Sequence, residues 1–117
     1  MQNKNFIIPC KNNVGAFIDV NVNAIDEILV NKIKEAVNEY GVIFFRNQKL
    51  DSNEYINFAK NFGICADYPM LKGLEGYPEI TVVEKKIDEK IMFGEGWHTD
   101  STYTSHPPKF TMLYSIK

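Results

Sequence analysis

Arginine, histidine and cysteine are all scarce in this 117-residue chain, which has two histidines, two cysteines and, in Arg46, a single arginine. Cys10 and Cys65 are too few and too far apart for a disulfide framework or a paired zinc knuckle, so a reducing cytoplasm is the expected location. The net charge is −2, whereas proteins that bind nucleic-acid phosphates usually carry a basic excess, so nucleic acid is not an expected partner. No apolar run approaches the roughly 18 residues of a membrane span, and residues 6–8 are too short for a secretory signal, so no membrane association is expected.

The composition that remains is that of a globular protein. Hydrophobic residues make up 44% and charged residues 24% of the chain, with no repeat and no low-complexity tract. This length allows one domain at most.

Two helices are predicted from their apolar spacing and their end signals. Residues 23–40 place apolar side chains on one helical face, with Asn23 as the expected N-cap and Gly41 as the expected left-handed end. Asp51 and Glu54 form the pattern of a capping box at the start of a second helix that Gly63 would end. Alternating or β-branched apolar residues predict strands, which we expect at residues 14–20, 42–45, 79–84 and 110–116. Residues 64–78 are expected to form a loop and residues 85–90 a solvated turn.

The sequence His98-Thr99-Asp100 is the clearest candidate for chemistry. In an extended strand, side chains two positions apart lie on the same face, about 6.6 Å apart at roughly 3.3 Å per residue. An imidazole and a short carboxylate can converge from there on one metal ion. Two histidines and one carboxylate on one face of an octahedron are typical of non-haem Fe(II) oxygenases. The tripeptide alone is weak evidence, because it also arises by chance at strand ends.

Several separate motifs, in order, give the chain a resemblance to a known family. The chain looks like the taurine dioxygenase (TauD/TfdA) family in residues 94–103, which have His98 and Asp100 at their centre, and in residues 107–114 that follow. Residues 40–48 and the Phe-Gly at residues 62–63 resemble the same family's N-terminal signature. The resemblance extends from about residue 14 to residue 116.

The resemblance implies an Fe(II)- and 2-oxoglutarate-dependent dioxygenase with a jelly-roll core, or double-stranded β-helix. His98 and Asp100 match the family's first two iron ligands. In such enzymes 2-oxoglutarate chelates the iron and is decarboxylated to succinate, and dioxygen is used to hydroxylate a small organic acid. Tyr68 matches a tyrosine of a substrate-lining loop. Gly94 stands where some members carry an asparagine that contacts substrate, which leaves sulfonates, aryloxy acids and other small carboxylates open.

The chain departs from the family by omission. The family's distal histidine and the arginine that clamps 2-oxoglutarate have no match, so the residues that bind the cosubstrate are unknown here; Arg46 matches an N-terminal arginine instead. We therefore expect an α+β fold in which residues 1–117 form a single partial domain. It would be the N-terminal part of a jelly roll, an incomplete barrel with two flanking helices. The polypeptide alone is expected not to turn over substrate, and measurable 2-oxoglutarate decarboxylation by it would contradict this.

Two alternatives remain open from the sequence. One is a non-catalytic partial jelly roll whose open strand at residues 110–116 pairs with another chain, including a second copy of itself in a homo-oligomer. The other is a zinc hydrolase site formed by His98, Asp100 and His106, with a water as the fourth ligand.

Overall fold

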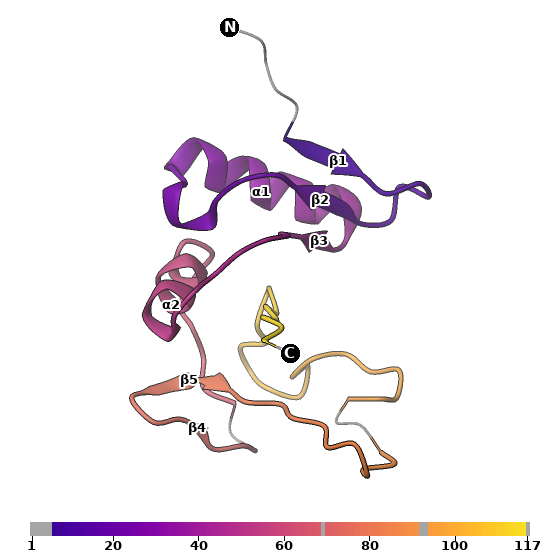
Figure 1. Ribbon diagram of the computed structural model, residues 1–117, viewed down its shortest axis with the longest axis vertical. Helices are drawn as coiled ribbons and strands as arrows, with labels where there is room; N and C mark the ends of the chain where they lie inside the picture. Colours follow the sequence, from indigo (N-terminus) through magenta and orange to yellow (C-terminus); the bar gives the residue numbers. More distant parts are fainter. Residues whose placement is uncertain (1–5, 69, 92–93, 117) are drawn as a thin grey trace, which may run out of the picture. The chain divides into compact units, whose positions relative to one another are not determined.

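The computed structural model describes residues 6–68, 70–91 and 94–116 (Figure 1). The chain divides into two compact units, and the boundary in the sequence falls between Gly63 and Ile64. The N-terminal unit contains a three-stranded sheet in the order β1-β2-β3. Strand β1 (Ile7–Pro9) pairs antiparallel with β2 (Ala16–Ile18), and β2 pairs parallel with β3 (Ile43–Phe44). A parallel pair needs a long crossover connection, and here the crossover contains helix α1 (Glu27–Tyr40).

Helix α1 begins four residues later than the sequence pattern suggested. Its N-cap is Asp26, whose carboxylate accepts a hydrogen bond from the Leu29 N–H at 2.8 Å. The predicted cap, Asn23, is wrong: it lies in a short 3-10 helix, Val22–Ala24, and its side chain donates to Glu54 at 3.0 Å. Gly41 ends the helix as predicted, with a φ of 77° that favours glycine.

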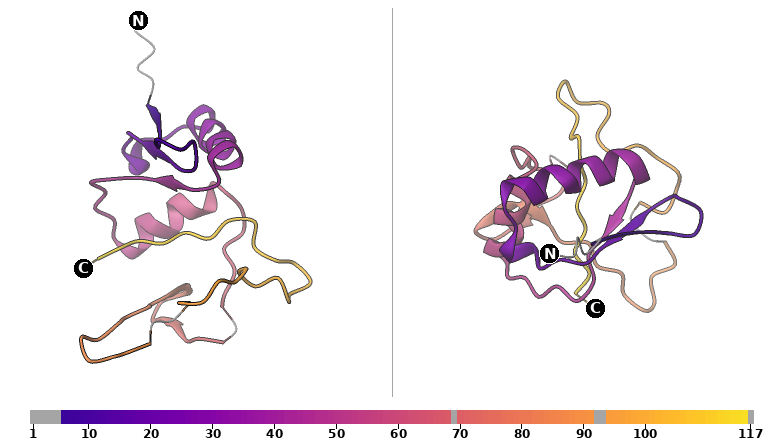
Figure 2. Two further views of the ribbon diagram at one scale, coloured as in Figure 1. Left: turned by 90° about the vertical axis from the view of Figure 1, so that its right-hand side faces the viewer. Right: turned by 90° about the horizontal axis from the view of Figure 1, so that it is seen from above.

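The core of the N-terminal unit lies between α1 and the sheet. Ile18 of β2 and Ile33 and Ala36 of α1 are each at most 2% exposed and pack against one another. The helix thus packs along one face of the sheet (Figure 2). Burial of these aliphatic side chains is the main source of stability expected for a sheet this short.

Helix α2 (Ser52–Lys60) starts at the capping box that the sequence predicted. Asp51 accepts from the Glu54 N–H, and Glu54 accepts from the Asp51 N–H, both at 2.8 Å. Just before the helix, the Gln48 amide accepts from the Val22 N–H and donates to the Val20 carbonyl. These two bonds tie the turn after β3 to the segment after β2.

The C-terminal unit has much less regular structure (Figure 2). Its described residues contain one hairpin, in which β4 (Gly73–Leu74) pairs antiparallel with β5 (Tyr77–Thr81). A side chain at Gly73 would collide with the backbone of Pro78, which explains the glycine. The hairpin was only half predicted: β5 begins two residues before the expected strand, and β4 lies in the expected loop.

Replacing Gly73 with alanine is expected to disrupt this hairpin. The added Cβ meets main-chain atoms that cannot turn aside, and such overpacking costs about 1–3 kcal/mol. Hydrogen exchange should show lost amide protection in Tyr77–Thr81. Gly96→Ala is the matched control, because a Cβ at Gly96 meets no atom within 4 Å, so amide protection should not change. Unchanged amide protection in Gly73→Ala would contradict the steric argument.

The predicted strand at residues 110–116 is wrong. No strand is formed there, although its side chains do alternate: Phe110, Met112 and Tyr114 are half-buried, and Thr111 and Leu113 are exposed. Alternation fixes the sides on which side chains lie, but a strand also needs a partner in register. The open strand that the chain-pairing alternative required is therefore not supplied by the described residues.

The five strands of the described ranges form two small sheets and do not close into a barrel. In the same ranges, neither α-helix is both long enough and apolar enough to cross a lipid bilayer.

Candidate functional site

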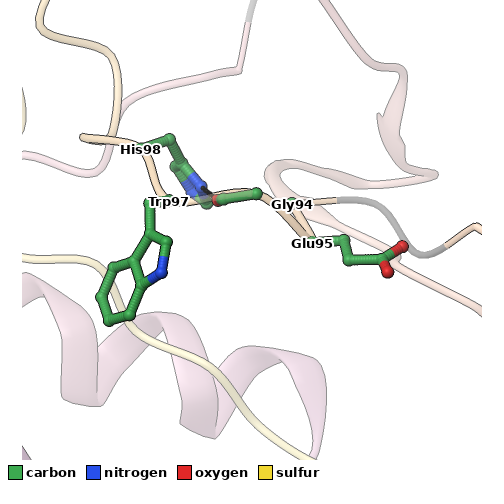
Figure 3. Close-up of a pocket in the computed structure, with 5 residues that line it drawn as sticks. Gly94, Glu95, Trp97 and His98 are labelled. Atoms are coloured by element: carbon green, nitrogen blue, oxygen red, sulfur yellow. Dashed lines mark hydrogen bonds between the residues drawn. The ribbon is translucent and has the colours of Figure 1, made fainter.

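A hollow of about 320 Å³ opens beside His98, one of the two predicted ligands, in the C-terminal unit. The backbone turns sharply there, because Gly94 has a φ of 76° that few residues other than glycine adopt. In Figure 3 the side chains of Trp97 and Glu95 extend to different sides of the chain, away from the His98 ring. The residues that line the hollow are Gly94, Glu95, Gly96, Trp97 and His98.

A main-chain carbonyl two residues earlier in the sequence orients the ring of His98. Its Nδ1 lies 2.6 Å from the Gly96 carbonyl oxygen, which can only accept, so Nδ1 carries the proton and donates it. The other ring nitrogen, Nε2, lies 3.0 Å from Oδ1 of Asp100 and forms an ion pair with it when His98 is protonated. The bond to Gly96 raises the pKa of His98, and the negative charge and hydrogen bond of Asp100 add to the rise, while partial desolvation opposes it.

The two carboxylate oxygens of Asp100 have different partners. Oδ1 faces His98, and Oδ2 accepts a hydrogen bond from the Thr111 hydroxyl at 2.7 Å. The next residue, Ser101, has a φ of 50°, so the chain turns away directly after the carboxylate. The Thr104 N–H closes that turn by donating to the Ser101 carbonyl at 3.1 Å.

The distance between the two donor atoms suits one metal ion. Two bonds of about 2.1 Å at a right angle place their donor atoms about 3 Å apart, and Nε2 and Oδ1 are 3.0 Å apart. The side chains are 51% and 46% exposed, so an ion can reach both. The extended-strand geometry from which the sequence argument started does not apply, because no strand of the described residues includes His98 or Asp100; residues with positive φ, Gly94 and Ser101, lie on either side of them.

No third metal ligand lies beside His98 and Asp100 among the described residues. Among residues 6–68, 70–91 and 94–116, no group of three His, Cys, Asp or Glu side chains could hold a metal ion. His106 contacts the Ser105 hydroxyl through Nδ1 at 3.0 Å. The zinc site of His98, Asp100 and His106 is therefore not formed.

The two predicted substrate residues lie in the same unit as the ligand pair. Tyr68 forms a hydrogen bond with Tyr103, which raises the pKa of Tyr68, and burial and the nearby charge of Asp100 raise it further. Tyr68 therefore keeps its phenolic proton at neutral pH. A Cβ at Gly94 would lie 3.5 Å from Cε1 of the His98 ring, an ordinary contact distance. The side chain of any residue replacing Gly94 would thus stand beside the proposed metal ligand.

Sequence reasoning missed Thr111 altogether. It is eleven positions from Asp100, and the sequence pattern only included it in the strand expected at residues 110–116. No local motif signals a contact of that kind.

Comparison with known proteins places this chain in a family. Residues 7–117 match the taurine catabolism dioxygenase TauD, TfdA family. An alkylsulfatase from Acinetobacter baylyi is 31% identical over 93 residues, 79% of this chain and 28% of that protein. An alpha-ketoglutarate-dependent sulfate ester dioxygenase from Pseudomonas putida is 29% identical over 93 residues, again 79% of this chain and 30% of that protein.

The fold agrees with the sequence match. The crystal structure of a taurine dioxygenase from Burkholderia xenovorans superposes with a TM-score of 0.69 at 27% identity, covering 87% of this chain and 36% of that one. The chain thus spans about a third of the length of the relatives it matches. A family match over nearly the whole chain, together with this structural likeness, shows that the chain belongs to the TauD/TfdA dioxygenase family.

Proposed function

We propose that this chain supplies His98 and Asp100 as two ligands of Fe(II) in a 2-oxoglutarate-dependent dioxygenase that hydroxylates a small organic acid. The observation that carries the proposal is the 3.0 Å separation of Nε2 and Oδ1 on two half-exposed side chains. When bound, Fe(II) and 2-oxoglutarate would activate dioxygen, with one oxygen atom passing to succinate as 2-oxoglutarate loses carbon dioxide and the other becoming the hydroxyl group of the product.

The protein's own part is to hold both donors ready. The Gly96 carbonyl fixes a proton on Nδ1, so Nε2 is the nitrogen that would bind the ion, once it has released the proton that it shares with Asp100. Two donors leave most of an octahedral ion's positions open. The third protein ligand and the clamp for the far carboxylate of 2-oxoglutarate are not assigned to residues of this chain. Within the proposal, the two small sheets belong to a larger jelly roll, and the 117-residue polypeptide alone does not decarboxylate 2-oxoglutarate.

For the substrate we propose a small sulfonate or sulfate ester, ahead of aryloxy acids and other carboxylates. Two matching relatives are named for alkyl sulfates or sulfate esters and one for taurine. The protonated Tyr68 hydroxyl would donate to an anionic oxygen of such a substrate in exchange for its hydrogen bond with Tyr103. Gly94, which has no side chain, would leave room for the substrate beside His98. Asparagine tolerates a positive φ better than most residues, so it can replace Gly94 without breaking the turn.

Titration of the isotope-labelled chain with Co(II) alone, followed by NMR without oxygen, tests the metal site. Paramagnetic effects should be strongest in residues 96–101, around the two donors. The polar hollow of the N-terminal unit, which includes Asp19 and Gln48, serves as the internal control and should be unaffected.

The outcome also separates the alternatives. Effects centred on His106 would favour the zinc arrangement over the proposed one. Effects spread evenly over the acidic surface would show non-specific binding and would remove the support for an iron site.

A further inference from the structure

We propose that Thr111 is a positioning residue that selects which oxygen of Asp100 faces the metal. The inference deepens the proposed function and rests on it. The observation behind it is the asymmetry of the carboxylate: Oδ2 accepts the Thr111 hydroxyl at 2.7 Å, whereas Oδ1 lies 3.0 Å from Nε2 of His98.

The Asp100 carboxylate has two contacts that orient it, the imidazole of His98 at Oδ1 and the hydroxyl of Thr111 at Oδ2. Its side chain is 46% exposed, and the terminal torsion of aspartate is broad and roughly two-fold, so either oxygen could turn toward His98. Hydrogen bonds to an ionised acceptor are shorter and stronger than neutral ones. The short bond from Thr111 therefore holds one orientation and occupies Oδ2.

Thr111 is itself held in place by its neighbours. It is the exposed residue between Phe110 and Met112, both half-buried. Alternation of buried and exposed side chains fixes the side on which the hydroxyl lies. The hydroxyl therefore lies on the exposed side of this segment, where it donates to the Asp100 carboxylate.

One-oxygen binding matters because coordination positions are few. A set of two histidines and one carboxylate leaves three positions of an octahedron open, and 2-oxoglutarate, as a chelator, takes two. If Asp100 bound through both oxygens, its second oxygen would take the last open coordination position. By occupying Oδ2, Thr111 keeps that position open.

The test compares Thr111→Val with Thr111→Ser in Co(II) titrations of the 117-residue chain. Valine keeps the shape of threonine but cannot donate, so the affinity should fall about 10-fold, as for other outer hydrogen-bond partners of metal ligands. Serine keeps the hydroxyl and should restore wild-type affinity. The infrared carboxylate bands of the Co(II)-loaded chain should also move closer together in Thr111→Val, the signature of binding through both oxygens.

Thr99→Val is the matched control, because the Thr99 hydroxyl lies between the two ligands in sequence but contacts Thr102, 3.0 Å away. It should bind Co(II) as the wild type does. Unchanged affinity and unchanged bands in Thr111→Val would overturn the role of Thr111 and leave the two ligands standing. If wild type and Asp100→Ala bound Co(II) equally, the proposed function would fail, and this inference with it.

Discussion

Replacing Ile33 with alanine is expected to lower the free energy of unfolding of the N-terminal unit by about 3 kcal/mol. Ile33 is 1% exposed and packs against Ile18 of β2, where helix and sheet share their few buried side chains. Alanine favours the helix itself, so the loss comes from the cavity and the missing contacts. Urea unfolding followed by helical circular dichroism measures it, since both α-helices lie in this unit.

Ile28 gives the matched control. It is on the same helix but 68% exposed, and surface changes usually stay within about 0.5 kcal/mol. If Ile28→Ala cost as much as Ile33→Ala, the core would not lie where the structure places it.

Replacing either His98 or Asp100 with alanine is expected to abolish measurable Co(II) binding, a loss of at least about 100-fold. This exceeds the roughly 10–100-fold cost of losing an outer partner of a ligand, because half of the chain's proposed donor set disappears. Both side chains are about half exposed, so neither change should affect folding. Calorimetric titration with Co(II), alongside circular dichroism of each variant, checks both points.

His106→Ala separates a specific site from general histidine binding. His106 is the only other histidine and contacts Ser105, so its removal should leave the Co(II) affinity unchanged. Wild-type affinity in His98→Ala would refute the proposed ligand pair.

Sequence patterns predicted the helical part of this fold better than the strands. Residue-local signals, such as the Asp51 and Glu54 box or the glycine at position 41, act within one turn and appear in the structure as expected. The N-cap was misplaced because Asn23 and Asp26 are both good caps, and the choice depends on the contact between Asn23 and Glu54, 31 residues apart. Short strands such as Ile7–Pro9 have too few residues to show a period.

In the candidate site, too, local spacing was predicted from the sequence and contacts between distant residues were not. The spacing of His98 and Asp100 predicted that they would lie close together, and they do, but on turns rather than on a strand. The positive φ at Ser101 and the hydroxyl of Thr111 had no signal in the sequence, because serine rarely adopts that conformation and the contact spans eleven residues.

That spacing has an energetic consequence for assembly. Closing a loop of only two residues costs very little chain entropy, whereas the cost rises with the logarithm of loop length. Bringing the imidazole of His98 to the carboxylate of Asp100 therefore demands almost nothing of the rest of the polypeptide. In the proposed site, the same short stretch would present both donors to an ion while distant segments are still unfolded, so metal capture would not have to wait for the rest of the chain to order.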